Sequence, residues 1–512
     1  MNNSRRFRLA AIAGLSVAAL IGGCASSDDT GLASLGDSGA MAANDGSAGA
    51  DQDPVTSEAV AENDWVDVAV QPISTFSSDV DTASYSMLRY LLNSGQFYAG
   101  MQEAIRIEEM LNYFDYGYQA PDADAERPFN VEVKVAAAPW NPSHQLAQIG
   151  VKAKEARPAT EGNNVVLLLD TSGSMSHEDK LPLLVESFKL LAEQLGERDR
   201  ISVITYAGGH ETLLEGVTGD KADQVIDALE SLTADGSTAG ADALAEAYDL
   251  AAEHFIEGGN NRILLATDGD FNVGPSSVEE LTNQITEARG DGVFISVFGF
   301  GIHSHDALME AIADNGNGNY FYIDNLKEAR RALADQFDST MFTVAKDLKL
   351  QVEFNPAEVA QYRLIGYENR VLANEDFEDD LVDAGDVGAG ATVTALYELV
   401  PSPAEQEDAE QPATVEPGTW MTVSTRYKDP DGTESKQDDF PAPIDAPDVA
   451  DDDDWRWAAA VAEFGLILRD SQHKGEATLE QVKSLAGGAL GEDPYGLRAE
   501  FLELVDLYAD SI

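Results

Sequence analysis

Val165-Val-Leu-Leu-Leu-Asp170-Thr-Ser172-Gly-Ser174 is the stretch around which the rest of the chain is organised. Its five consecutive apolar residues predict a strand that is buried on both faces, as in a parallel sheet. The strand ends at one carboxylate and two hydroxyls, spaced two residues apart, and a helical apolar pattern follows over residues 181–195. The polar side chains therefore occupy a strand-to-helix loop at the carboxyl end of a strand, where open α/β sheets bind ligands.

Two later segments supply further oxygen donors. Ile263-Leu-Leu-Ala-Thr-Asp268 is a second apolar run that ends in an acid, and Gly-Ser-Thr238-Ala-Gly precedes an amphipathic helix predicted over 239–256. Carboxylates and small hydroxyls are hard ligands suited to Mg²⁺, which takes few protein carboxylates and keeps some of its waters. Taken alone, the Asp-Thr-Ser-Gly-Ser turn is also compatible with a loop whose Ser and Asp side chains cap a helix.

With these residues in this order, the region resembles a von Willebrand factor type A (VWA) domain with its metal-ion-dependent adhesion site. The family's Asp-x-Ser-x-Ser motif matches Asp170, Ser172 and Ser174, its threonine matches Thr238, and its second aspartate matches Asp268. The resemblance implies that the serines bind Mg²⁺ or another divalent cation directly. It implies that the aspartates bind directly or through water, and that Thr238 ligates in the ligand-bound state. In the family, an open position on the metal accepts an acidic side chain of a partner protein.

Alternating strand and helix patterns predict the fold class of residues 163–345. They indicate an α/β domain with a doubly wound, mostly parallel sheet, of the Rossmann-like type. The expected strands are 165–169, 200–206, 262–267, 293–299 and 319–323, and the expected helices are 181–195, 221–231, 239–256, 278–289, 305–315 and 326–340.

The segments on either side of this domain are β-rich. Alternating patterns predict strands at 129–135 and 146–151 before it, and at 348–354, 362–367 and 391–400 after it. We therefore expect a β-sandwich assembled from both sides, with the VWA domain inserted. Acid- and proline-rich residues 401–418 and 429–454 are expected to be loops, and two apolar helical stripes that close the chain are expected to pack in a core.

Both flanking segments also resemble parts of a family of bacterial lipoproteins. Residues 76–85, Phe-Ser-Ser-Asp-Val-Asp-Thr-Ala-Ser-Tyr, resemble the VWA-associated N-terminal region, here residues 63–160. Residues 363–370, Arg-Leu-Ile-Gly-Tyr-Glu-Asn-Arg, resemble the C-terminal domain of the same proteins, here residues 346–512. Asp79 and Asp81 are candidate metal ligands, although a helix-capping and loop role is favoured.

The first 24 residues have the pattern of a lipoprotein signal peptide. A basic start is followed by a short apolar run over residues 9–21 and by Ile-Gly-Gly-Cys24, which resembles the bacterial lipobox. The resemblance implies diacylation of Cys24, whereas an ordinary secreted protein with a chance cysteine is the alternative. Residues 25–62 lack large apolar groups and are expected to form a disordered acidic tether. These features predict a lipid-anchored protein of the cell envelope, on a periplasmic or extracellular face. By resemblance to the enterobacterial lipoprotein sorting rule, Ala25 rather than Asp after the cysteine slightly favours the outer membrane.

The charge of the chain excludes one class of partner. Its 512 residues carry 92 acidic against 32 basic side chains, a net charge of −60, so a basic face for nucleic acid is not available. The single cysteine, Cys24, also excludes an intramolecular disulfide. Self-repulsion of like charges at low salt is screened within roughly 10 Å at 0.1 M ionic strength.

The predicted function is metal-dependent binding of a partner protein by a membrane-tethered, extracytoplasmic VWA protein, which is not expected to be an enzyme. Two alternatives remain open: a metal-dependent hydrolase on the same sheet, and a structural envelope protein whose metal only stabilises the fold. A hydrolase needs a general base near the metal, and the candidates are His177, Glu178 and Asp270. The chain contains no Gly-x-Ser-x-Gly elbow and no Walker loop.

Overall fold

A computed structural model describes residues 61–98, 105–122, 124–155, 161–237, 240–269, 278–301, 306–403, 415–430, 432–447 and 449–511. They belong to one compact unit of the chain, residues 53–512. The predicted signal peptide, its Cys24 and nearly all of the predicted tether lie outside the described residues. Within the described ranges, none of the helices has both the length and the apolar character needed to cross a membrane.

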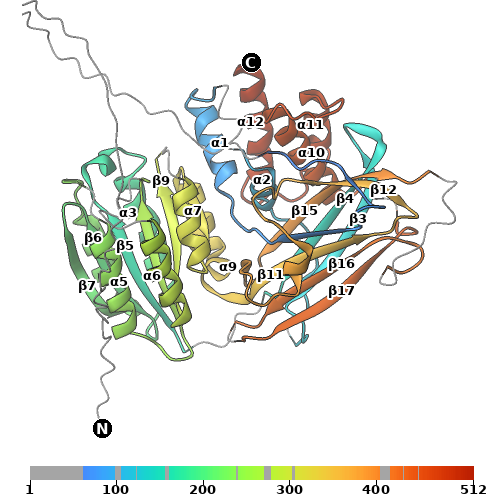
Figure 1. Cartoon of the computed structure of the whole chain (residues 1–512). Helices are drawn as coiled ribbons and strands as arrows, with labels where there is room; N and C mark the ends of the chain where they lie inside the picture. The colour runs from blue at the N-terminus through green and yellow to red at the C-terminus, as the bar shows by residue number, and fades with distance from the viewer. Residues whose placement is uncertain are drawn as a thin grey trace, which may run out of the picture. The chain divides into compact units, whose positions relative to one another are not determined.

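A six-stranded sheet forms the middle of the chain, with the strand order β10-β9-β8-β5-β6-β7 (Figure 1). Its strands are β5 (Asn163–Asp170), β6 (Arg200–Tyr206), β7 (His210–Thr218), β8 (Asn260–Thr267), β9 (Val293–Phe300) and β10 (Tyr320–Ile323). Neighbouring strands run parallel except β7, which is antiparallel to β6. The predicted doubly wound, mostly parallel sheet is confirmed. Strand β7 was not predicted, because this half-exposed edge strand has no continuous apolar run.

Helices cover both faces of this sheet, so β5 is buried along its whole length. Val165, Leu167 and Leu169 pack against helices on one face, and Val166 and Leu168 pack against helices on the other. The first group of helices is α3 (Leu181–Ala192), α4 (Ala222–Glu230), α8 (Leu326–Arg330) and α9 (Phe337–Met341), and the second is α5 (Ala241–Glu253), α6 (Val278–Gly290) and α7 (Asp306–Asn315).

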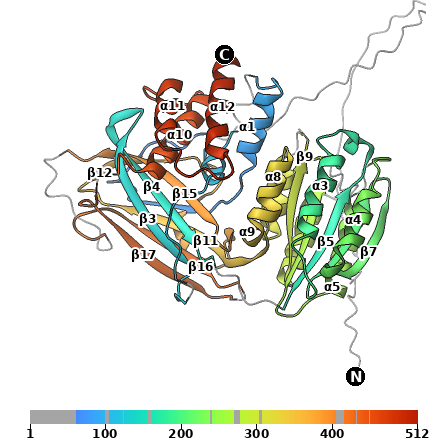
Figure 2. The same ribbon diagram turned by 180° about the vertical axis from the view of Figure 1, so that it is seen from behind.

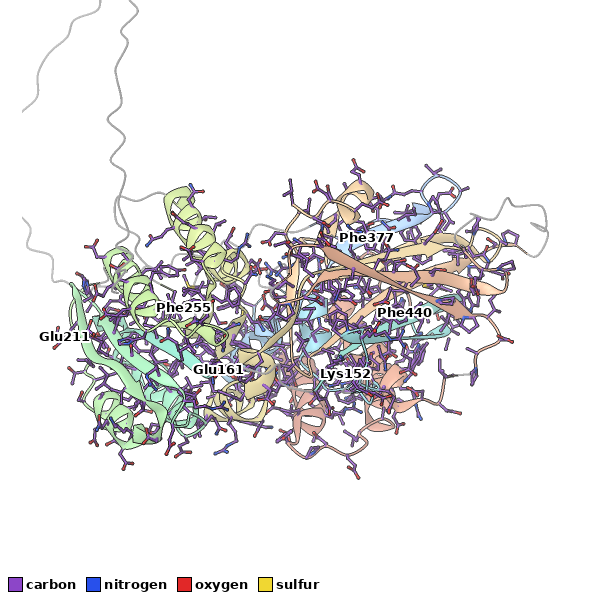
Figure 3. All side chains as sticks on the ribbon, turned by 90° about the horizontal axis from the view of Figure 1, so that it is seen from below. Lys152, Glu161, Glu211, Phe255, Phe377 and Phe440 are labelled. Carbon is purple, nitrogen blue, oxygen red and sulfur yellow. The ribbon has the colours of Figure 1, made fainter. Side chains whose placement is uncertain are left out.

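Two of these helices differ from their predicted bounds. The helix expected over 326–340 is divided, because a π-helical turn at Arg331–Asp335 separates α8 from α9. The helix expected over 239–256 ends at Glu253, so Phe255 lies beyond it and is 39% exposed. Figure 3 labels Phe255 among the green elements of this domain.

Two further sheets share one hydrophobic core and form the predicted sandwich. One has the order β1-β12-β15-β4-β3, and the other has the order β13-β2-β11-β16-β17, with β14 beside β11. Strands from before the VWA domain pair with strands from after it, since β4 pairs with β15 and β2 with β11. The strands are β1 (Val66–Asp67), β2 (Ile73–Ser77), β3 (Phe129–Ala138), β4 (Asn141–Ala153), β11 (Thr343–Phe354), β12 (Val359–Ile365), β13 (Val371–Leu372), β14 (Gly385–Gly388), β15 (Thr392–Pro401), β16 (Thr419–Lys428) and β17 (Ser435–Pro443).

Strand β17 corrects the prediction that residues 429–454 form a loop. It lies at the edge of its sheet and pairs with β16 alone. Pro441 and Pro443 are tolerated there because an edge strand needs ladder hydrogen bonds on one side only. Phe440 of this strand, labelled in Figure 3, packs against the sandwich core.

A layer of helices packs against the sandwich: α1 (Ala83–Asn93), α2 (Ile107–Asn112), α10 (Asp453–Leu468), α11 (Leu479–Gly487) and α12 (Leu497–Ser511). Helix α1 lies beside α12 (Figure 2), and α2 lies beside α10 (Figure 1). The ring of Phe501 in α12 is 5.2 Å from that of Trp457 and 5.5 Å from that of Phe464, both in α10. The prediction that the two C-terminal apolar stripes form core is confirmed.

Asp79 and Asp81 act in a buried loop rather than as helix caps. The Oδ1 atom of Asp79 accepts from the backbone N–H of Asp81, and Oδ1 of Asp81 accepts from that of Tyr320 at the start of β10. Both carboxylates also lie near the Arg370 guanidinium, at 3.5 and 3.6 Å. Neither side chain caps α1, whose N-cap is Thr82, so the loop part of the prediction is right and the capping part is wrong.

Glu108 in α2 is a buried carboxyl group. Its side chain is fully buried, and neither carboxylate oxygen has a hydrogen-bond partner among the described residues. Burial, the largest cause, and the negative charges of Glu368 and Asp79 raise the pKa of Glu108, Arg106 opposes them, and the net result is a pKa of about 8. The folded protein therefore favours the protonated form of Glu108 at neutral pH.

Replacement of Glu108 by Gln is expected to stabilise the protein at pH 8 and to flatten its pH dependence. Between its ordinary pKa of 4.5 and its folded value of about 8, the folded state binds a proton that the unfolded chain releases. The contribution of this group to the free energy of unfolding is therefore lost as the pH rises, by about 3 kcal/mol between pH 5.5 and pH 8. Urea unfolding at pH 5.5 and pH 8 measures this, with exposed Glu197→Gln as the control. An equal effect of Glu108→Gln at both pH values would contradict it.

Candidate metal centre

Two buried carboxylates lie at the carboxyl ends of adjacent parallel strands. Asp170 is the last residue of β5, Asp268 directly follows β8, and both side chains are fully buried. The two strands pair in register, with Leu169 opposite Ala266, which brings both carboxylates to the same edge of the sheet. Burial, the largest cause, raises the pKa of Asp170, hydrogen bonds from Ser172 oppose this and the charge of Asp268 adds to it, so that the net pKa is about 6.

The loop after β5 is folded around the Asp170 side chain. Its Oδ1 accepts from the backbone N–H of Ser172 at 2.8 Å, and its Oδ2 accepts from the Thr267 hydroxyl at 3.2 Å. The hydroxyl oxygens of Ser172 and Ser174 lie 2.9 Å apart. Ser172 is buried and Ser174 is exposed, so the hydroxyl pair leads from the buried carboxylate toward the surface. The structure thus brings together four of the five residues predicted to bind metal.

The segment that precedes Thr238 borders the same loop. The backbone N–H of Gly173 donates to the carbonyl oxygen of Gly236 at 3.0 Å. The backbone N–H of Asp235 donates to the carbonyl oxygen of Thr171 at 2.9 Å. A Cβ atom at Gly173 would lie 3.3 Å from the Gly236 carbonyl, tighter than most real contacts of this kind. Thr238 itself lies outside the described residues, so its predicted role stays a prediction.

Asp268 has one paired and one unpaired oxygen. Its Oδ2 accepts from the Lys180 ammonium at 2.9 Å, whereas its buried Oδ1 has no hydrogen-bond partner within the described part of the chain. Lys180, which directly precedes α3, is 15% exposed. Sequence reasoning missed this lysine, and no motif marks it, because its role depends on how the ten-residue loop from Asp170 returns toward β8.

The residues present fit a divalent cation. The donor set consists of two carboxylates and a pair of hydroxyls, all hard oxygen ligands, and an unpaired carboxylate oxygen is costly to bury unless a ligand satisfies it. Nowhere in the described ranges do three or more His, Cys, Asp or Glu side chains gather as a metal site. The present set has two carboxylates only, with hydroxyls beside them.

Two of the three candidate general bases, His177 and Glu178, lie at the surface of the same loop. The His177 side chain is 77% exposed, and its Nδ1 lies 2.5 Å from Oδ1 of Asp179. The other carboxylate oxygen of Asp179, Oδ2, accepts from the Tyr90 hydroxyl at 3.0 Å. Glu178 is exposed as well, and Asp270 lies outside the described residues. The contact of His177 with Asp179 is one that an ordinary exposed histidine makes, and it does not mark His177 as a general base. The expectation that the protein is not an enzyme stays a prediction.

Comparison with known families agrees with this fold. Three family models match successive parts of the chain: "von Willebrand factor" over residues 53–148, "von Willebrand factor type A domain" over 164–336, and "Uncharacterized protein YfbK, C-terminal" over 339–510. The molecule is therefore a VWA-domain protein, a class that typically mediates protein–protein interaction and often binds a divalent metal.

The family within this class follows from one relative. The protein named "Uncharacterized protein YfbK" of Escherichia coli (strain K12) is 41% identical over 471 residues, which are 88% of this chain and 80% of that protein. The chain belongs to the YfbK family.

Two further proteins are less similar, one because the match covers a smaller part of the chain and the other because the sequence identity is lower. "Uncharacterized protein sll0103" of Synechocystis sp. is 30% identical over 198 residues, 38% of this chain and 45% of that protein. Among solved structures, "von Willebrand factor type A from Catenulispora acidiphila" is 17% identical, with a TM-score of 0.40, and the match covers 75% of this chain and 90% of that one.

Proposed function

We propose that the protein binds an acidic group of a partner protein through a divalent cation, Mg²⁺ or a similar ion, in its VWA domain. Asp170, Ser172, Ser174 and Asp268 would hold the cation, together with Thr238. The observation that carries the proposal is the meeting of two buried carboxylates and a hydroxyl pair at one sheet edge, where one oxygen of Asp268 has no hydrogen-bond partner among the described residues. When bound, the metal supplies a Lewis-acidic position for an oxygen ligand.

The chain's own residues prepare this position. The backbone N–H of Ser172 and the hydroxyl of Thr267 hold both oxygens of Asp170, so the carboxylate is oriented before any cation arrives. Ser174 is exposed next to buried Ser172, so a large partner can reach the outer hydroxyl without opening the fold. Such preorganisation lowers the entropic cost of binding.

The experiment that tests the proposal is Mg²⁺-dependent capture of a partner from envelope extract. Wild-type protein is compared with Asp170→Ala/Ser172→Ala, and the complex is challenged with EDTA. A partner that the wild type alone captures, and that EDTA releases, supports metal-dependent binding. Equal capture by both proteins would contradict it.

We also propose that the protein acts in the cell envelope, anchored through lipid on Cys24 and an acidic tether over residues 25–62. The support is the sequence pattern at residues 1–24, because a basic start, a short apolar run and a lipobox-like end occur together. A single acyl group anchors weakly, whereas two acyl chains hold a protein on a membrane stably.

Replacement of Cys24 by Ser is expected to move the protein from the membrane fraction to the soluble fraction and to abolish labelling by a palmitate analogue. Only a residue that carries the lipid has both effects. Cell fractionation and metabolic labelling measure them, with Ser27→Ala as the neighbouring control. Unchanged membrane association of Cys24→Ser would contradict the anchor.

A further inference from the structure

We propose that Lys180 sets the charge balance of the metal site, so that it weakens the hold on the cation and strengthens the hold on an acidic ligand. The inference rests on the proposed function and concerns a residue that the Asp-x-Ser-x-Ser motif does not include. It is carried by one contact, the 2.9 Å approach of the Lys180 ammonium to Oδ2 of fully buried Asp268.

The fold holds Lys180 in this place. Its backbone N–H donates to the carbonyl oxygen of His177 at 3.1 Å, and its own carbonyl accepts from the N–H of Leu184 at 2.8 Å in the first turn of α3. The main chain is therefore fixed on both sides of the residue. The side chain is 15% exposed and reaches inward to a carboxylate with no exposure. A pair placed so far from solvent is screened much less than a surface pair.

The two carboxylates of the site, Asp170 and Asp268, carry two negative charges, and Lys180 cancels one of them. A divalent cation bound beside Asp170, Asp268 and Lys180 therefore gives the site a net charge of plus one. Without Lys180, the same cation would give the site a net charge of zero. The ammonium also repels a cation on the carboxylate that it contacts. Lys180 thus opposes metal binding and leaves a positive charge for a carboxylate ligand.

This residual charge matters in a protein with a net charge of −60. An acidic partner is repelled by such a surface at low salt, and like charges across an interface suppress association. The residual positive charge of the loaded site offsets that repulsion where the partner's carboxylate must bind. The partner class that this arrangement selects is a protein that presents an exposed Asp or Glu side chain.

The test compares Lys180→Met, which removes the charge and keeps the length of the side chain, with Lys180→Arg, which keeps the charge. Mn²⁺ serves as the metal probe, and its binding is followed by electron paramagnetic resonance at constant pH and salt. Lys180→Met is expected to bind Mn²⁺ at least about tenfold more tightly than the wild type, because one repulsive charge beside the cation is gone. Lys180→Arg is expected to stay close to the wild type.

A second arm measures the opposite effect on the ligand. Acetate is titrated against the Mn²⁺-loaded proteins, and the fall in water proton relaxivity reports displacement of metal-bound water. Acetate is expected to bind more weakly to Lys180→Met than to the wild type, so the two affinities change in opposite directions. A merely structural role for Lys180 would weaken both.

The outcomes separate this inference from the proposed function. A wild type that does not bind Mn²⁺ contradicts the proposed function itself. A wild type that binds, with Lys180→Met binding equally or less tightly, overturns the role of Lys180 alone. Melting temperatures in EDTA identify variants that fail to fold, and Lys180→Gln replaces Lys180→Met in that case.

Discussion

Replacement of Arg89 by Met is expected to lower the free energy of unfolding by about 3–5 kcal/mol, the largest effect of any single substitution proposed for this protein. Arg89 lies in α1, is 2% exposed, and donates from Nε to Oδ2 of Asp324 at 2.7 Å. It also donates to Glu328 and Glu500, each at 3.0 Å, and to the Tyr113 hydroxyl at 2.6 Å. The substitution leaves buried carboxylates without their cationic partner, and an uncompensated buried charge strongly destabilises the folded state.

Arg331 reduces the destabilisation caused by Arg89→Met and therefore limits the expected loss in the free energy of unfolding. It donates from Nε to Glu328 at 2.8 Å and from Nη2 to the Thr82 hydroxyl at 2.8 Å. The Tyr113 hydroxyl also donates to Glu328, at 2.7 Å, so Glu328 keeps one cationic and one neutral partner in the variant. Arg331 and Arg89 hold the pKa of Glu328 at about 2 although its burial acts to raise it. Asp324, by contrast, loses its only guanidinium contact among the described residues.

Equilibrium urea unfolding, followed by circular dichroism and tryptophan fluorescence, measures the effect of Arg89→Met. The matched control is Lys436→Met, which breaks a pair with Asp429 in which both side chains are about half exposed. Such surface pairs are worth about 0–1 kcal/mol. Arg89→Lys is expected to fall between the two, because Lys keeps the charge but not the guanidinium fork. Indistinguishable midpoints for Arg89→Met and Lys436→Met would contradict the buried-network account.

The sequence predicts the VWA sheet and its metal residues because the same residues carry both signals. In β5 and β8 an apolar run that demands burial stops at Asp170 and at Asp268, so strand and site are marked together. The edge strands β7 and β17 escape prediction for the opposite reason. Both are partly exposed and rich in polar residues, and each is stabilised by pairing with the strand that precedes it across a turn.

The sequence also does not predict which charged residues are buried and paired. Arg89 and Glu328 are 239 positions apart in the chain, and neither lies in a local pattern that marks it as buried. Glu108 lies in a short helix whose neighbours on the sandwich and on α10 decide its burial. Lys180 reaches Asp268 across 88 positions. Long-range ion pairs depend on the assembled fold, and single-sequence periodicity does not contain that information.

The second large effect is expected at the metal site. Loss of Asp170 and Ser172 together removes a carboxylate that is already oriented by Ser172 and Thr267, and half of the hydroxyl pair. A metal that keeps only a few protein ligands does not tolerate the loss of two of them. Metal-dependent capture of a partner is therefore expected to fall to background, whereas Ser176→Ala, an exposed serine at the end of the same loop, is expected to capture as well as the wild type.

Two precautions make the result interpretable. Capture is performed in saline buffer, because an acidic partner and this acidic protein repel each other at low salt. Asp170→Asn/Ser172→Ala accompanies the alanine variant, since Asn keeps the shape of the buried side chain, and melting temperatures in EDTA show that each variant folds.

The measurement that tests the central claim most directly is the amount of partner captured from envelope extract by wild type and by Asp170→Ala/Ser172→Ala, each in Mg²⁺ and in EDTA. The account predicts one or more proteins in the wild-type Mg²⁺ sample alone. A partner captured equally by both proteins, or retained in EDTA, would contradict it and would place the working surface on the sandwich or the helical layer.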